Sequence, residues 1–221
     1  MEKYPTDRIV KEFDNLEIKK STRERLMPYL ERLRSYHEPT FEHSVRVANL
    51  SKQIAEFTHN IEPKTPWLSG LVHDFGKLKI QKGLLEKRSG WNGKDAESMR
   101  KHIEFGCSIL LGLANFSAFT TFYSHYFKKE NSYPTDEDFT KIFGTTYKDW
   151  SKASRLKGMY CGRLVALADV YDAITTRENE KFSPNNPRLL SSEEAETIFL
   201  ETNPDQSFLI KQLYSAGIFK K

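Results

Sequence analysis

Residues 43–57, HSVRVANLSKQIAEF, decide the fold class of this chain. The apolar residues of this stretch recur at i, i+3, i+7 and i+10, and they are Val47, Leu50, Ile54 and Phe57. That spacing is the period of one face of an α-helix. His43 falls on the same face and is therefore expected to point toward the core. Taken alone, such a residue is more often a hydrogen-bonded core histidine than a ligand.

The same period recurs along most of the chain, and we find no convincing alternation typical of a strand. It is repeated by Met99, His102, Gly106 and Ile109. Ser21 and Ser191 each stand three residues before a glutamate and are predicted to cap helix N-termini. Helices are predicted to end near Gly70, Gly76 and Gly158. We therefore expect an all-α bundle of six to eight helices.

The composition of the 221 residues fits one globular domain. The 15 Phe and 10 Tyr exclude a disordered chain, which lacks such apolar surface. The net charge of +4 suits an anionic small molecule and falls short of a nucleic-acid-binding pattern, so no stable nucleic-acid binding is expected. The two cysteines form no disulfide framework. The sequence also lacks a signal-peptide core and an apolar run of about 18 residues, so we expect a cytoplasmic protein with no membrane partner.

His73 and Asp74 give the strongest local signal for chemistry. They follow the apolar run at residues 67–72 and precede Gly76 and Lys77, so an imidazole, a carboxylate and an ammonium group converge near an expected helix end. A buried carboxylate is unfavourable without a compensating cation. The glycine lets the backbone turn, and the lysine can direct its charge toward a phosphate.

Further titratable side chains fall within later predicted helices. His102 lies on an inward face, and His125 lies in an aromatic run where a structural role is as plausible as a ligand role. Asp169 and Asp172 stand at i and i+3 within the apolar stretch 163–174. An acid in such a helix requires a metal or a cationic partner.

Together these residues supply four imidazoles and two carboxylates as candidate metal ligands. The six are His43, His73, Asp74, His102, His125 and Asp169. Such a set suits first-row transition metals such as Mn, Fe, Co, Ni or Zn. We expect two divalent ions bridged by Asp74 and by a hydroxide, which would attack a phosphorus atom in line while Lys77 neutralises the phosphate.

The order of these motifs resembles that of the HD superfamily of metal-dependent phosphohydrolases, and within it the HD-GYP branch of cyclic-dinucleotide phosphodiesterases. The matching segments are HSVRVANLS from His43, HDFGK at 73–77, LLEK at 84–87, MRKHIEFGCSIL around His102, His125, and LADVYDAITTR at 167–177. The resemblance implies one helical HD domain over residues 35–221, preceded by a helical extension at residues 1–34.

Transferred residue by residue, the metal ligands of the family fall on the six candidates already named. Asp74 and Lys77 become the catalytic residues, and Lys77 becomes the phosphate-contacting lysine. Asp172 becomes an acid that supports a ligand from behind or caps a helix.

The chain departs from the pattern of the HD-GYP branch at three places. The branch has two adjacent histidines followed by glutamate and, eight residues beyond the second, Gly-Tyr-Pro; the corresponding residues here are Ser124-His125-Tyr126 and Ser132-Tyr133-Pro134. Pro39 stands where some members have a glutamate for a third metal, which favours two ions. Residues 135–160 form an atypical insertion, read either as a lid over the substrate or as a solvated excursion.

The resemblance implies a phosphodiesterase that hydrolyses a cyclic dinucleotide, with cyclic di-GMP as the expected substrate. Two alternatives stay open. One is an HD-domain nucleotidase or phosphatase acting on mononucleotides, which the changed loop at Ser132 favours. The other is a catalytically silent module that senses a nucleotide. A homodimer or a regulatory partner is compatible with each of them.

Overall fold

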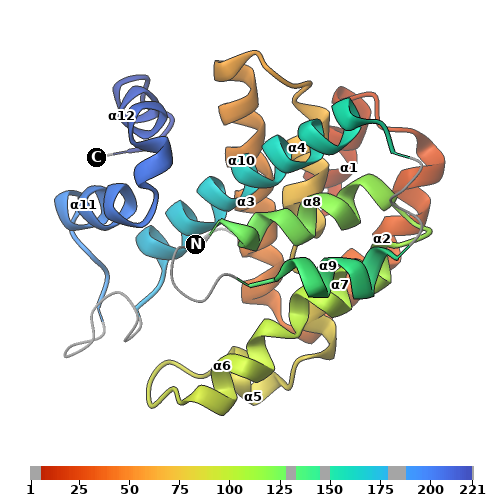
Figure 1. Ribbon diagram of the computed structural model, residues 1–221, viewed down its shortest axis with the longest axis horizontal. Coiled ribbons are helices and arrows are strands. Elements are labelled where there is room, and N and C mark those ends of the chain that lie inside the picture. The colour runs from red at the N-terminus through yellow and green to blue at the C-terminus, as the bar shows by residue number, and fades with distance from the viewer. Residues whose placement is uncertain (1–5, 128–132, 145–149, 179–187, 221) are drawn as a thin grey trace.

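The computed structural model describes residues 6–127, 133–144, 150–178 and 188–220, and every regular element among them is helical (Figure 1). Its centre is a set of four helices that pack on one another: α3 (Glu38–Thr58), α4 (Lys64–Val72), α8 (Asn115–Tyr126) and α10 (Lys152–Thr176). The all-α prediction is confirmed. The described residues form more helices than the six to eight expected, because several short ones lie between the long ones.

The N-terminal helices are part of the bundle. Helices α1 (Thr6–Asn15) and α2 (Lys20–Tyr36) carry residues of the predicted extension. Their buried side chains, among them Phe13 and Leu30, belong to the same apolar cluster as Trp67 of α4. The rings of Phe13 and Trp67 meet edge to face, with centroids 5.1 Å apart. A fully buried side chain of this size contributes about 1.5–3 kcal/mol to folding.

A second apolar cluster joins the C-terminal helices to α3 and α10. Helix α11 (Ser192–Thr202), the short 3₁₀ helix η2 (Pro204–Gln206) and helix α12 (Ser207–Ser215) lie together at the end of the chain coloured blue in Figure 1. Phe199 and Phe219 pack with Tyr171 of α10, whose ring centroid lies 4.3 Å from that of Phe219. Ser191 and Glu194 form the predicted capping box at the start of α11.

Two of the local predictions about helix ends are wrong. Helix α2 begins at Lys20, with no side-chain cap from Ser21. Gly158 lies inside α10, where a Cβ would come within 2.4 Å of the Phe119 ring of α8. Gly162, one turn later, would bring a Cβ within 2.6 Å of Tyr123. These two glycines let α8 and α10 approach closely and do not end a helix.

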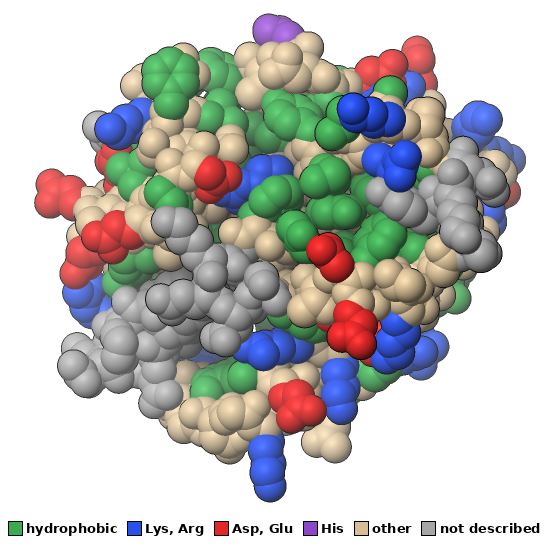
Figure 2. Space-filling view, viewed as in Figure 1, with side chains coloured by type: hydrophobic (Ala, Val, Ile, Leu, Met, Phe, Trp, Pro, Cys, Tyr) green, Lys and Arg blue, Asp and Glu red, His purple; other side chains and the backbone are tan. Residues whose placement is uncertain are grey.

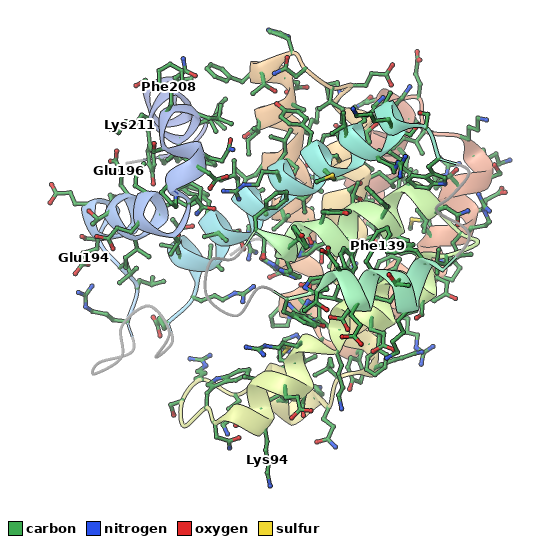
Figure 3. The ribbon with its side chains drawn as sticks, in the orientation of Figure 1. Lys94, Phe139, Glu194, Glu196, Phe208 and Lys211 are labelled. Atoms are coloured by element: carbon green, nitrogen blue, oxygen red, sulfur yellow. The ribbon has the colours of Figure 1, made fainter. Side chains whose placement is uncertain are left out.

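The described part of the atypical segment is packed onto the bundle. Helix α9 (Asp136–Phe143) places Phe139 and Phe143 against Phe119 and Phe122 of α8, with ring centroids 5.2–5.9 Å apart, and Figure 3 shows Phe139 where α9 meets α8. Lys141 forms an ion pair with Glu104 of α7 (His102–Leu110). Residues 136–143 are therefore not a solvated excursion, whereas the lid over the substrate stays a prediction; Ser132 lies outside the described residues.

A helical hairpin extends from the bundle beside the end of α4. It comprises the 3₁₀ helix η1 (Phe75–Lys79), the short helix α5 (Lys82–Leu85) and helix α6 (Gly93–Arg100), and it leads into α7 (His102–Leu110). Helices α5 and α6 project at the bottom of Figure 1.

The surface shows no separation into fields of one charge on the face seen in Figure 2, where basic, acidic and hydrophobic side chains are interspersed. No described helix combines the length and the apolar character that a membrane span requires.

Candidate metal centre

His43, on α3, faces two aspartates of α10. Its Nδ1 lies 2.6 Å from Oδ2 of Asp172, and its Nε2 lies 3.1 Å from Oδ1 of Asp169. Helical spacing explains this geometry, because positions 169 and 172 are neighbours on one helix face. The acids that the sequence placed in an apolar helix thus have an imidazole between them.

Asp74 lies at the junction between α4 and η1 and is almost completely buried. Its two oxygens face different histidines. Oδ2 lies 3.6 Å from Nε2 of His43 and 3.5 Å from Nε2 of His73, whereas Oδ1 lies 3.7 Å from Nε2 of His102. Lys77, one turn further along, donates to Oδ2 over 2.6 Å. One carboxylate therefore connects two groups of imidazoles.

His125, on α8, completes the second group. Its Nε2 lies 3.1 Å from Nε2 of His102, and its Nδ1 lies 4.0 Å from Oδ2 of Asp169. The structure thus brings all six predicted ligands together from five separated segments of the chain. Their role as ligands stays a prediction.

Three of the imidazoles are held in one orientation by hydrogen bonds at Nδ1. The Nδ1 of His73 lies 2.7 Å from the carbonyl oxygen of Gly70, that of His102 bonds to the carbonyl oxygen of Met99, and that of His43 bonds to the Asp172 carboxylate. Because these oxygens accept, each Nδ1 carries a proton, and the neutral rings of His73 and His102 present a lone pair at Nε2. Imidazoles that bind metals in proteins are oriented in this way.

Burial and charge set the protonation of the cluster. Burial lowers the pKa of His102 to about 4 and also lowers the pKa of His73, so both rings are neutral at pH 7. Burial opposes ionisation of Asp74, but the neighbouring His73 and Lys77 outweigh it and hold the pKa of that carboxyl well below its usual range. Neutral imidazoles and ionised carboxylates are the forms that bind metals.

The cluster fits a metal centre on the evidence of its own polar atoms. Within the described residues, the buried Nε2 atom of His73 has no hydrogen-bond partner. An orphaned polar atom at such depth is unfavourable unless something else satisfies it. His43, His73 and Asp169 each offer a ligand atom, and those atoms lie within 4.8 Å of one another. Nitrogen and carboxylate oxygen donors together suit divalent first-row metals.

Arg46 is a residue at this site that the sequence analysis missed. Its Nε donates to Oδ1 of Asp172 over 2.6 Å, and its Nη2 donates to Oδ2 over 3.0 Å. These two hydrogen bonds hold the Asp172 carboxylate, which in turn accepts a hydrogen bond from His43. The sequence could have indicated Arg46, because it stands one helical turn after His43 on the same helix face.

The cluster opens into a cleft of about 1380 Å³. Its lining includes Asp74, Lys77, His102 and His125 beside the centre, and it extends to residues of the α5–α6 hairpin and of the α10–α11 connection. This volume exceeds the roughly 300–1,000 Å³ of ordinary small-molecule sites. Among the described residues of the segment 126–160, only Phe127 lines this cleft.

An all-α fold with a buried cluster of histidines and aspartates beside a cleft is typical of helical domains that bind metal ions. A model of the HD domain family matches residues 40–174, which is more than half of the chain. The chain therefore belongs to the HD domain family, which confirms the family that the order of the motifs predicted.

Comparison with individual proteins agrees with this assignment. The chain is 28% identical over 152 residues to the Cyclic di-GMP phosphodiesterase PA4108 of Pseudomonas aeruginosa. The aligned region covers 66% of this chain and 33% of that protein. It thus spans about a third of the length of this curated relative. The HD domain of the L. monocytogenes phosphodiesterase PgpH superposes with a TM-score of 0.55 at 16% identity, covering 84% of this chain and 86% of that one. The same domain in complex with Cyclic-di-AMP gives a TM-score of 0.52 at the same identity and coverage. These two likenesses show the fold.

Proposed function

We propose that this domain is a metal-dependent phosphodiesterase that hydrolyses a cyclic dinucleotide, with cyclic di-GMP as the first candidate. The metal ligands in this proposal are the six side chains described above, and they hold two divalent ions. Asp74 and Lys77 act at the reacting phosphate, and Asp172 orients His43.

The arrangement of Asp74 is the observation that carries the proposal. One of its oxygens faces His43 and His73, and the other faces His102, whose partner is His125. A carboxylate placed in this way can bridge two ions. The first ion would take His43, His73 and Asp169, and the second would take His102 and His125.

Two ions bound there would supply a water of lowered pKa as nucleophile and would stabilise negative charge on the phosphate. The protein contributes the rest. Lys77, whose side chain is 13% exposed at the edge of the cluster, is placed to neutralise a phosphate oxygen. Asp172 and Arg46 fix the ring of His43, so that its Nε2 keeps its direction when a ligand binds.

The size of the cleft and the two named relatives support a dinucleotide substrate. A cleft of about 1380 Å³ has room for a ligand larger than a mononucleotide. The curated relative is a cyclic di-GMP phosphodiesterase by name, and the solved PgpH complex contains cyclic di-AMP. We name cyclic di-GMP first because the relative found by sequence similarity is the cyclic di-GMP phosphodiesterase. Membership of the HD-GYP branch belongs to the same proposal, with Ser124 and Ser132 as its departures.

A turnover assay tests the proposal. Protein loaded with Mn or Fe is incubated with cyclic di-GMP, cyclic GMP-AMP, cyclic di-AMP and a set of mononucleotides, and products are identified by mass spectrometry. We expect loss of a cyclic dinucleotide with a linear product. Turnover of mononucleotides alone would replace this function by that of a nucleotidase. Bound metal with no turnover would indicate a sensing module.

A pair of variants connects the activity to the cluster. Asp74→Ala should retain the fold and lose both turnover and bound metal, measured by elemental analysis. Asp14→Ala is the matched control, because it removes an aspartate whose ion pair with Arg23 is on the surface. Undiminished turnover by the Asp74 variant would refute the proposed role of this carboxylate.

A further inference from the structure

Trp91 lies in the loop between α5 and α6 and lines the same cleft as Asp74 and His102. Its side chain is 39% exposed, which is unusual for an indole in a domain with room to bury it. The other two tryptophans serve the core. Trp67 is buried, and Trp150 stacks on Phe116 with ring planes 10° apart.

The loop holds this indole in place. Its Nε1 donates to the carbonyl oxygen of Lys87 over 3.1 Å. The ammonium group of Lys87 lies 2.7 Å from Oδ2 of Asp95, and the same carboxylate oxygen accepts from the backbone of Asn92 as part of the capping box of α6. An aromatic ring fixed in this way loses little conformational freedom when a ligand covers it.

The surroundings of Trp91 favour a ligand that is both flat and anionic. Leu189, from the α10–α11 connection, also lines the cleft and is 50% exposed, so exposed apolar surface stands at two separate edges. Arg88 also lines the cleft and adds positive charge near the indole, whereas the ammonium group of Lys87 is paired with Asp95. Apolar faces with adjacent cations match the bases and phosphates of a nucleotide.

We propose that Trp91 is a base-stacking residue that binds one nucleobase of the substrate at the α5–α6 edge of the cleft. This inference rests on the proposed function and adds a subsite to it. Stacking on the indole accepts any base, because every base has a π-face. Trp91 and Lys77 line the same cleft. Trp91 therefore contributes to substrate binding and does not take part in bond cleavage.

Fluorescence and kinetics of three variants test the subsite. Trp91→Leu keeps an apolar side chain and removes the ring, Trp91→Phe keeps a smaller ring, and Trp150→Phe is the matched control. Quenching of tryptophan fluorescence is titrated with cyclic di-GMP, cyclic di-AMP and GMP using metal-free protein, and KM and kcat are measured with Mn-loaded protein.

We expect nucleotides to quench the wild type and the Trp150 variant and to lose most of this quenching in both Trp91 variants. Loss of one stacked base corresponds to about 10- to 100-fold weaker binding in Trp91→Leu, and we expect a smaller effect in Trp91→Phe. KM should rise accordingly, with kcat changed by less than about threefold.

The outcomes separate this inference from the proposed function. Equal KM values for the wild type and Trp91→Leu, with a cyclic dinucleotide turned over by both, would overturn the subsite and leave the function standing. Quenching through Trp91 without turnover of any cyclic dinucleotide would support the subsite and refute the function. Absence of quenching by every nucleotide, together with no turnover of a cyclic dinucleotide by the Mn-loaded protein, would overturn both.

Discussion

Replacement of Gly76 by alanine should destabilise the fold and disrupt the metal centre together. A Cβ at this position would lie 1.7 Å from the carbonyl oxygen of His102, 2.5 Å from the backbone nitrogen of Gly106 and 2.7 Å from the carbonyl carbon of His102. All three are backbone atoms of α7, so no side-chain rotation relieves the clash. Helix α7 must move away from η1.

The size of the effect follows from that displacement. Ordinary contacts of a Cβ begin at 3.4 Å, so an atom now at 1.7 Å must move by about as much again. Overpacking in a closely packed interior costs about 1–3 kcal/mol and occasionally more, and a clash with backbone belongs at the upper end. We expect a loss of about 3 kcal/mol, a large part of the roughly 5–15 kcal/mol that stabilises a typical domain.

Urea denaturation followed by circular dichroism measures this loss. With a denaturant dependence of about 1–3 kcal/mol per molar, a loss of about 3 kcal/mol should lower the midpoint of Gly76→Ala by roughly 1–3 M. Gly83→Ala is the matched control, because a Cβ there meets no atom within 4 Å. It lies in the short helix α5, where alanine should leave stability unchanged or raise it by up to about 1 kcal/mol.

Metal binding provides the second measurement. Because the atom that clashes belongs to His102, Gly76→Ala should also shift this imidazole relative to Asp74 and weaken metal binding. Coincident midpoints for the two glycine variants, together with unchanged metal content, would refute the reasoning from the close approach of η1 and α7.

Three further predictions concern the surroundings of the centre. Arg46→Gln should reduce metal affinity by about 10- to 100-fold in a calorimetric titration, because the Asp172 carboxylate that orients His43 loses the two hydrogen bonds from the guanidinium group. The surface variant Arg23→Gln should bind metal with normal affinity. Burial opposes ionisation of Asp172, but hydrogen bonds with His43 and Arg46 lower its pKa to about 2 from 3.8. The ionised carboxylate therefore contributes about 2 kcal/mol to the free energy of unfolding. This contribution is complete above pH 4 and is lost as the pH falls toward 2. Urea midpoints between pH 5 and pH 2 should therefore fall less steeply for Asp172→Asn than for the wild type, and equal slopes would contradict the assignment. Burial raises the pKa of Cys161 to about 12 and that of Cys107 even further above its usual value, so iodoacetamide at pH 8 should modify neither thiol until urea is added; rapid labelling of the folded protein, seen by mass spectrometry, would show that the thiols are accessible.

The sequence by itself determined the helical fold and the set of candidate ligands. Apolar spacing such as that of residues 43–57 is a local property, and it correctly predicted a helix that buries His43. The capping box at Ser191 is equally local, because a side chain and a backbone three residues apart satisfy one another. Asp74 and Asp169 were found because a carboxylate in an apolar environment demands a partner wherever the chain folds. The four histidines were added from their positions in the predicted helices and from the order of motifs that resembles the HD superfamily.

Only the tertiary structure decided how distant segments meet. Gly158 looked like a helix end, yet it lies inside α10, because the Phe119 ring of α8 occupies the place of its side chain. Residues 136–143 were compatible with either a lid or a solvated excursion, and the packing of their aromatic side chains on α8 excludes the excursion. The fork of Arg46 on Asp172 joins residues 126 positions apart. Close approach and long-range pairing depend on atoms that are remote in the chain, so no local pattern carries them.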